Sequence, residues 1–269
     1  MSSMLRSRIL MLSVGVHMLT LGGCASSSAP STFLPRPSNP VAGGGSAPAG
    51  ATIEPSGAPV MELASGCGDI EDCRLRAGTY VTSGTYPFMR GLKFTVPDGW
   101  ISPYHALGEL ALQPPGFDDY GLFLSRDAVA VPGHRKLVVD PTADASELAA
   151  WIARHPDLTV STPEEVLIGD GIQATTLVVS VGPDAESDDP QCPTRACVDF
   201  IQSWGQEHAL GMADGQFVRL YLADIRSASS PHMLMVNLYA PGEAQLDSLT
   251  ELARPVLESL VVPDVIEDN

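Results

Sequence analysis

Short runs of apolar residues, alternating with polar ones or rich in β-branched side chains, recur along the chain after residue 60. Such runs predict β-strands, and the glycine, proline and polar residues between them are typical of turns. Asp170-Gly171 follows Val166-Leu167-Ile168 and predicts a hairpin turn. The predicted strands are Thr79–Ser83, Leu92–Val96, Leu107–Leu112, Gly121–Ser125, Gly171–Val181, Val198–Trp204, Phe217–Ile225 and Met233–Tyr239.

Two segments instead have the three- and four-residue apolar spacing of an amphipathic helix. The first runs from Asp144 to His155 and is ended by Pro156. The second covers Glu243–Val261, and Pro255 inside it is expected to kink or split the helix. Strands outnumber helices and the long helix comes last. This order predicts an α+β fold, with a mainly antiparallel β-sheet flanked by helices.

The beginning of the chain has a different pattern. Met1–Arg8 is basic, and Ile9–Leu21 is mostly apolar but shorter than the roughly 20 residues that cross a bilayer. Together they predict a signal peptide at residues 1–23. Residues 24–59 consist largely of alanine, serine, proline and glycine, which predicts a disordered linker. Residues 60–269 are expected to form a single α+β domain.

The segment Leu21-Gly22-Gly23-Cys24 closes the leader and resembles a bacterial lipobox. That resemblance implies diacylglycerol on the Cys24 thiol, with palmitate-type acyl chains, and cleavage just before this residue. We therefore expect an exported protein that is lipid-anchored in the cell membrane and faces the extracytoplasmic side. The alternative is an ordinary signal peptide that happens to be followed by a cysteine.

Composition and charge narrow the class of partner. The 269 residues are 44% hydrophobic, and 15 Lys+Arg against 32 Asp+Glu give a net charge of −17. A nucleic-acid-binding surface needs clustered basic residues, whereas the only lysines here are Lys93 and Lys136, so no nucleic-acid partner is predicted. Anionic head groups also repel an acidic body, so the lipid on Cys24 must hold the protein at the membrane.

Four cysteines follow Cys24, and an even number in an exported chain predicts two disulfides. Four cysteines allow three pairings. The short spacings favour Cys67–Cys73 and Cys192–Cys197. Both spacings are wider than the Cys-x2-Cys of zinc sites and redox centres, so neither a metal site nor a cofactor is predicted.

Two charged clusters are candidate binding sites. The acidic run at residues 184–189 begins with the spacing of a calcium loop, but Arg195 stands where that loop has its last ligand. A solvated loop is the preferred interpretation, and weak calcium binding is the alternative. His134-Arg135-Lys136 is a tight basic cluster in this acidic chain. It is either a solvated turn or a contact for an anion or an acidic partner.

The segment Arg76-Ala77-Gly78-Thr79-Tyr80, with the later Leu92-Lys93-Phe94-Thr95-Val96-Pro97-Asp98-Gly99-Trp100, resembles the opening of uncharacterised exported lipoproteins of high-GC bacteria. It is also similar to the opening of PsbP-like domains, and the helix ending Leu257-Glu258-Ser259-Leu260 fits the same resemblance. The resemblance implies a PsbP-like sandwich, an antiparallel sheet flanked by helices. It implies no activity, because that fold hosts unrelated functions. Trp100 is expected to pack in the core.

The sequence contains no Gly-x-Ser-x-Gly nucleophile elbow and no His-x3-His metal spacing. We therefore expect a non-catalytic binding domain whose partner is an envelope protein or a small molecule. The alternative is a hydrolase-type envelope enzyme whose carboxylates or histidines come together only in the fold. Its candidate residues are Glu109, Asp118 and Asp119 near a Pro-Pro-Gly loop, and the scattered histidines His105, His134, His155, His208 and His232.

Overall fold

The computed structural model describes residues 59–63, 73–83, 89–103, 105–106, 109–117, 120–131, 144–187, 192–204, 209–226 and 231–263. Contacts within the chain divide it into two units, Met1–Ile53 and Glu54–Asn269. All of the described residues belong to the second unit. The predicted signal peptide, Cys24 and the predicted linker before residue 59 lie outside the described residues.

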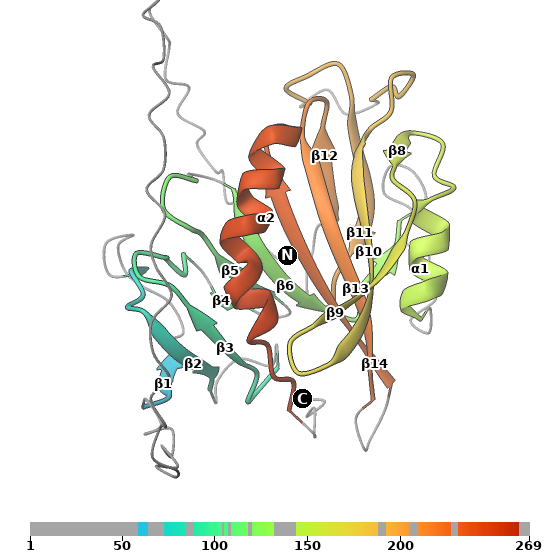
Figure 1. Cartoon of the computed structure of the whole chain (residues 1–269). Coiled ribbons are helices and arrows are strands. Elements are labelled where there is room, and N and C mark those ends of the chain that lie inside the picture. Colours follow the sequence, from blue (N-terminus) through green and yellow to red (C-terminus); the bar gives the residue numbers. More distant parts are fainter. Residues whose placement is uncertain are drawn as a thin grey trace, which may run out of the picture. The chain divides into compact units, whose positions relative to one another are not determined.

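A large antiparallel sheet forms the centre of this unit (Figure 1). Every neighbouring pair in it is antiparallel, and β9 (Glu164–Ile168) pairs with one part of β10 while β8 pairs with another. The order of the remaining strands is β4 (His105–Ala106), β5 (Glu109–Leu112), β6 (Gly121–Arg126), β14 (Pro231–Ala240), β13 (Phe217–Arg226), β10 (Ile172–Val181) and β8 (Leu158–Val160).

Two three-stranded sheets and two helices complete the described fold. One small sheet has the order β1 (Met61–Leu63), β2 (Gly78–Thr82), β3 (Lys93–Val96), and β1 is parallel to β2. The other has the order β12 (Leu210–Ala213), β11 (Cys197–Gln202), β7 (Val129–Ala130). The helices are α1 (Ala145–Ile152) and α2 (Glu243–Glu258).

The large sheet separates two hydrophobic cores. Successive side chains of a strand point to opposite faces, so Tyr221, Ala223 and Ile225 of β13 enter one core while Leu220 and Leu222 enter the other. The first core contains α2 and β3, and the second contains α1 and β11. In Figure 1, α2 crosses the face of β13 and β14. Because β13 and β14 are buried on both faces, they read as almost continuous apolar runs.

The structure confirms the α+β class and the mainly antiparallel sheet. All eight predicted strands are present, with ends that differ by no more than two residues, and β9 and β10 form the predicted hairpin. The sequence pattern did not predict β1, β4, β7, β8 and β12. Each of these has only two to four residues, too few for alternation to be recognised.

Both predicted helices are present, and each is shorter than predicted. The Asp144 carboxylate caps α1 by accepting a hydrogen bond from the Glu147 backbone N–H at 2.8 Å, and this bond lowers the pKa of Asp144. Pro255 was expected to kink or split α2, and the split is wrong, because the helix continues to Glu258. Pro255 lies in the last turn, where the buried Val256 and Leu257 hold the helix against the first core.

Candidate functional site

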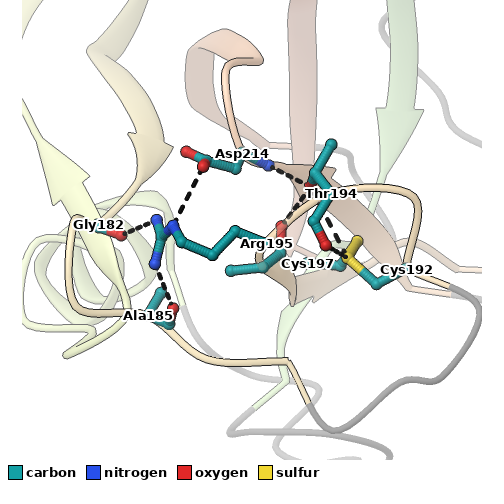
Figure 2. A network of polar contacts seen from close by, with 8 residues as sticks. Gly182, Ala185, Cys192, Thr194, Arg195, Cys197 and Asp214 are labelled. Carbon is teal, nitrogen blue, oxygen red and sulfur yellow. Dashed lines mark hydrogen bonds and ion pairs between the residues drawn. A yellow bond between two sulfur atoms is a disulfide. The ribbon is translucent and has the colours of Figure 1, made fainter.

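The end of β10 and the start of β11 carry the most connected polar site among the described residues. Cys192 and Cys197 form a disulfide, the pairing that their spacing predicted, with Cα atoms 5.7 Å apart. The bridge closes a short loop immediately before β11, and this loop presents Thr194 and Arg195 (Figure 2). Because the loop is covalently closed, these two side chains project from a restricted backbone.

Arg195 connects this loop to the segment that follows β10. Its Nη1 donates to the Ala185 carbonyl at 2.6 Å and its Nη2 donates to the Gly182 carbonyl at 3.1 Å. Its Nε lies 3.2 Å from Oδ2 of Asp214. The side chains of Arg195 and Asp214 are 45% and 40% exposed, so the ion pair adds little stability. The main effect of Arg195 is to fix the position of the loop at residues 182–187.

Thr194 joins the same network to the turn between β12 and β13. Its hydroxyl accepts a hydrogen bond from the Asp214 backbone N–H at 3.1 Å and donates to the Ala196 carbonyl at 3.0 Å. The Asp214 N–H also donates to the Ala196 carbonyl, at 2.9 Å. Figure 2 shows these contacts converging on Arg195 and the disulfide. Three loops from different parts of the chain are thereby held together.

These loops border an open, polar pocket of about 640 Å³, lined by Pro183, Asp184, Ala185, Glu186, Ser187 and Arg195. The Asp184 and Glu186 residues on its rim are exposed. Since Asp214 balances the charge of Arg195, the two rim carboxylates leave the pocket with a net negative charge. Such a pocket suits a polar ligand with a positively charged group.

The contacts of Arg195 bear on the alternative of a calcium loop. Its guanidinium donates hydrogen bonds to the Gly182 and Ala185 carbonyl oxygens, which are atoms of the kind that bind calcium. The positive charge of Arg195 beside them would also repel the ion. Within the ranges that the structure describes, no group of three or more His, Cys, Asp or Glu residues is arranged to hold a metal ion. Asp188 and Asp189 lie outside those ranges. The contacts of Arg195 therefore argue against calcium at the described part of the loop.

The network also leads to a direct prediction. Replacing Arg195 with alanine removes three contacts to the loop at residues 182–187 and to Asp214. The protein should stay folded, because the side chain is exposed, while amide hydrogen exchange at residues 184–187 becomes at least about tenfold faster. Arg254→Ala, which removes another surface ion pair, is the matched control. Equal amide hydrogen exchange at residues 184–187 in the two variants would contradict this role of Arg195.

The remaining predicted site residues do not gather into one described site. Cys73 is disulfide-bonded, and Cys67 lies outside the described residues. Trp100 is buried in the first core, as expected. Glu109 lies in β5, and His105 lies in β4. The residues that fall outside the described ranges are Asp118, Asp119, His134, Arg135, Lys136 and His208.

His155 is buried at the end of α1 and has structural contacts. Its Nδ1 accepts a hydrogen bond from the Asp157 backbone N–H at 3.2 Å, and its ring meets that of Trp151 edge to face at 5.1 Å. Burial lowers the pKa of His155. These two contacts fix the orientation of the His155 ring and indicate a structural role at the end of α1.

The sequence analysis missed a buried polar cluster that joins the end of β6 to the start of β14. The Asp127 carboxylate accepts from the Met233 backbone N–H at 3.0 Å, and its Oδ2 lies 3.0 Å from His232 Nδ1. Asp127 has a φ of +51°, a conformation that aspartate adopts more readily than most residues. Its neighbour Arg126 is 2% exposed and lies 4.2 Å from the centre of the Trp204 ring.

This cluster has one feature of an active site, since a histidine oriented by a carboxylate is the base of many hydrolases. The His232 side chain is 6% exposed, however, and the residue lies in β14, opposite Ile225 of β13. Arg126 is equally enclosed, and its Nε lies 3.6 Å from Asp127 Oδ2. The burial favours a structural role, in which Asp127 compensates the charge of Arg126 and ties β6 to β14.

Comparison with known proteins finds no matching family model and no matching curated protein. The resemblances to exported lipoproteins of high-GC bacteria and to PsbP-like domains therefore stay predictions. In the described part of the chain, no helix has the length and apolar character needed to span a membrane.

Proposed function

We propose that this chain is an exported lipoprotein, anchored in the cell membrane through Cys24, whose domain acts by binding and not by catalysis. The pocket fixed by Arg195 carries the proposal, because three loops hold its polar rim in place before any ligand arrives. Such preorganisation lowers the entropic cost of binding. The lipid and the linker raise the effective concentration of the domain at the membrane.

The charge of the pocket indicates the class of ligand. Asp184 and Glu186 stand on the rim, and the chain as a whole carries a charge of −17. An acidic cleft on an acidic protein attracts cations and accelerates their association. We expect the ligand, whether an envelope protein or a small molecule, to present an amine or a guanidinium to this pocket.

Removing one rim carboxylate tests this assignment. In calorimetric titrations of the full chain with spermine as the probe, Glu186→Gln should weaken binding by about threefold to tenfold, and the difference should shrink at high salt. Glu258→Gln, on the exposed face of α2, changes the net charge equally and is the control. Equal loss in both variants would show that only the net charge matters, and would contradict a site at the pocket.

The anchor is tested separately. Cys24→Ala in the full chain should abolish the acyl mass detected by mass spectrometry and move the protein from the membrane fraction to the soluble fraction. Two or three acyl chains contribute about 0.8 kcal/mol per buried CH₂, so their loss removes the anchoring energy. The neighbouring Ser26→Ala should keep both the acyl mass and the membrane location. Membrane retention of the Cys24→Ala variant would overturn the anchor.

A hydrolase-type envelope enzyme is the second candidate, because Asp127 orients His232. The purified chain should nevertheless give only background rates on esters, glycosides, peptides and phosphoesters, since His232 is enclosed. Turnover of any of these substrates that His232→Gln abolishes would establish the enzyme and replace the binding proposal.

A further inference from the structure

Strand β9 forms an open edge of the large sheet. Among the described residues it pairs with β10 on one side and with no strand on the other. The outward side of such a strand offers backbone N–H and C=O groups that can pair with another chain. Glu164, Glu165 and Leu167 of this strand are exposed. Leu167 is 74% exposed, more than any other large hydrophobic residue in the described ranges.

The strand is held firmly from behind. Val166 and Ile168 pack into the first core. At the hairpin turn, the Gly169 N–H donates to the Leu257 carbonyl at 2.7 Å. Gly169 has a φ of +52°, and a Cβ there would lie 2.1 Å from the Leu260 carbonyl oxygen, so the turn lies directly against the end of α2. An edge this rigid loses little entropy when a further strand adds to it.

The charged side chains of the edge are ordered as well. Glu165 accepts hydrogen bonds from Gln173 Nε2 at 3.1 Å and from Thr175 Oγ1 at 2.9 Å, both across the hairpin. Glu165 and Leu167 are two residues apart in a strand, so they share one face. The edge therefore combines a fixed carboxylate, a second exposed glutamate and one apolar side chain.

We propose that β9 is a docking edge for an extended segment of a partner protein in which pairs of basic residues alternate with pairs of apolar residues. The segment would add to the sheet as a further strand, with its backbone bonded to β9, its basic side chains near Glu164 and Glu165, and an apolar side chain against Leu167. Charge complementarity selects this occupant. A second copy of the chain would bring its own glutamates close to these ones, and each copy carries a charge of −17.

The docking edge is separate from the pocket of the proposed function. The hairpin turn stands at one end of β10 and the pocket follows the other end. A ten-residue strand spans about 30 Å. The two surfaces can therefore fail or succeed independently in experiments.

The test uses the full chain and an eight-residue fluorescent peptide that repeats Lys-Lys-Val-Val, and binding is followed by fluorescence anisotropy. The wild type should bind, and Leu167→Lys should weaken binding by about tenfold, because it removes the apolar contact and adds a repelling charge. Leu252→Lys, at an exposed leucine of α2, should bind like the wild type. A peptide methylated at every backbone nitrogen should not bind, since neither of its edges can donate the hydrogen bonds of strand pairing.

Several results would overturn the docking edge: no binding by the wild type, equal binding by Leu167→Lys and Leu252→Lys, or binding of the methylated peptide. Self-association of the wild type that Leu167→Lys abolishes would identify a second copy as the occupant instead. If Leu167→Lys fails to fold by circular dichroism, Glu164→Lys replaces it and should also weaken binding. Spermine binding in the Leu167→Lys variant should stay at the wild-type level, which separates this edge from the pocket.

Discussion

Replacing Asp127 with alanine is expected to destabilise the domain by about 3 to 5 kcal/mol, the usual effect of removing one partner of a buried charged pair. Arg126 is 2% exposed, and its Nε and Nη1 have no hydrogen-bond partner among the described residues. Without the Asp127 carboxylate its charge would stay buried and uncompensated. The variant would also lose the hydrogen bond from the Met233 N–H.

Asp127→Asn is the matched variant for this experiment. Asparagine tolerates a positive φ and can still accept the hydrogen bond from the Met233 N–H, but it carries no charge. In urea unfolding, the free energy of unfolding of Asp127→Asn should lie between those of the wild type and Asp127→Ala. Its difference from the wild-type value measures how much the charge of Asp127 stabilises the buried Arg126. If the free energies of unfolding of both variants lie within about 0.5 kcal/mol of the wild-type value, the cluster has no structural role.

The second large effect is expected at Trp100. Its side chain is 1% exposed and belongs to the core that contains α2 and β3. Trp100→Ala should lower the free energy of unfolding by about 3 to 5 kcal/mol. The substitution removes a large buried apolar surface, and the surrounding sheet and helix cannot relax enough to fill the cavity that it leaves. Trp151→Ala, at a partly buried residue of α1, is the control, and it should lower the free energy of unfolding measured in urea clearly less. Equal losses would contradict the assignment of Trp100 to a tightly packed core.

The central strands were predictable because burial on both faces leaves a strong pattern. Phe217–Arg226 and Pro231–Ala240 are long and nearly continuous in apolar or β-branched residues. Short strands such as β7 and β12 carry no comparable pattern and depend on their neighbours for pairing. Pro255 does not split α2, because buried residues beside it hold the last turn in place.

The polar sites were less predictable, because they depend on residues brought together by the fold. Asp127 and His232 are 105 positions apart in the sequence and meet only through the pairing of β6 and β14. Arg195 was noticed as a departure from a calcium loop, but its bonds to Gly182 and Ala185 depend on the position of that loop. The Cys192–Cys197 disulfide was predictable, since its partners are close in sequence.

Photo-crosslinking in native envelopes tests the binding proposal most directly. The membrane-anchored full chain would carry a photoreactive residue at Pro183, on the exposed rim of the pocket, or at Ser248, on the exposed face of α2. A binding domain that uses the pocket predicts a discrete adduct from position 183 that excess spermine suppresses, and no such adduct from position 248. No adduct from position 183, or the same adducts from both positions, would contradict the proposal.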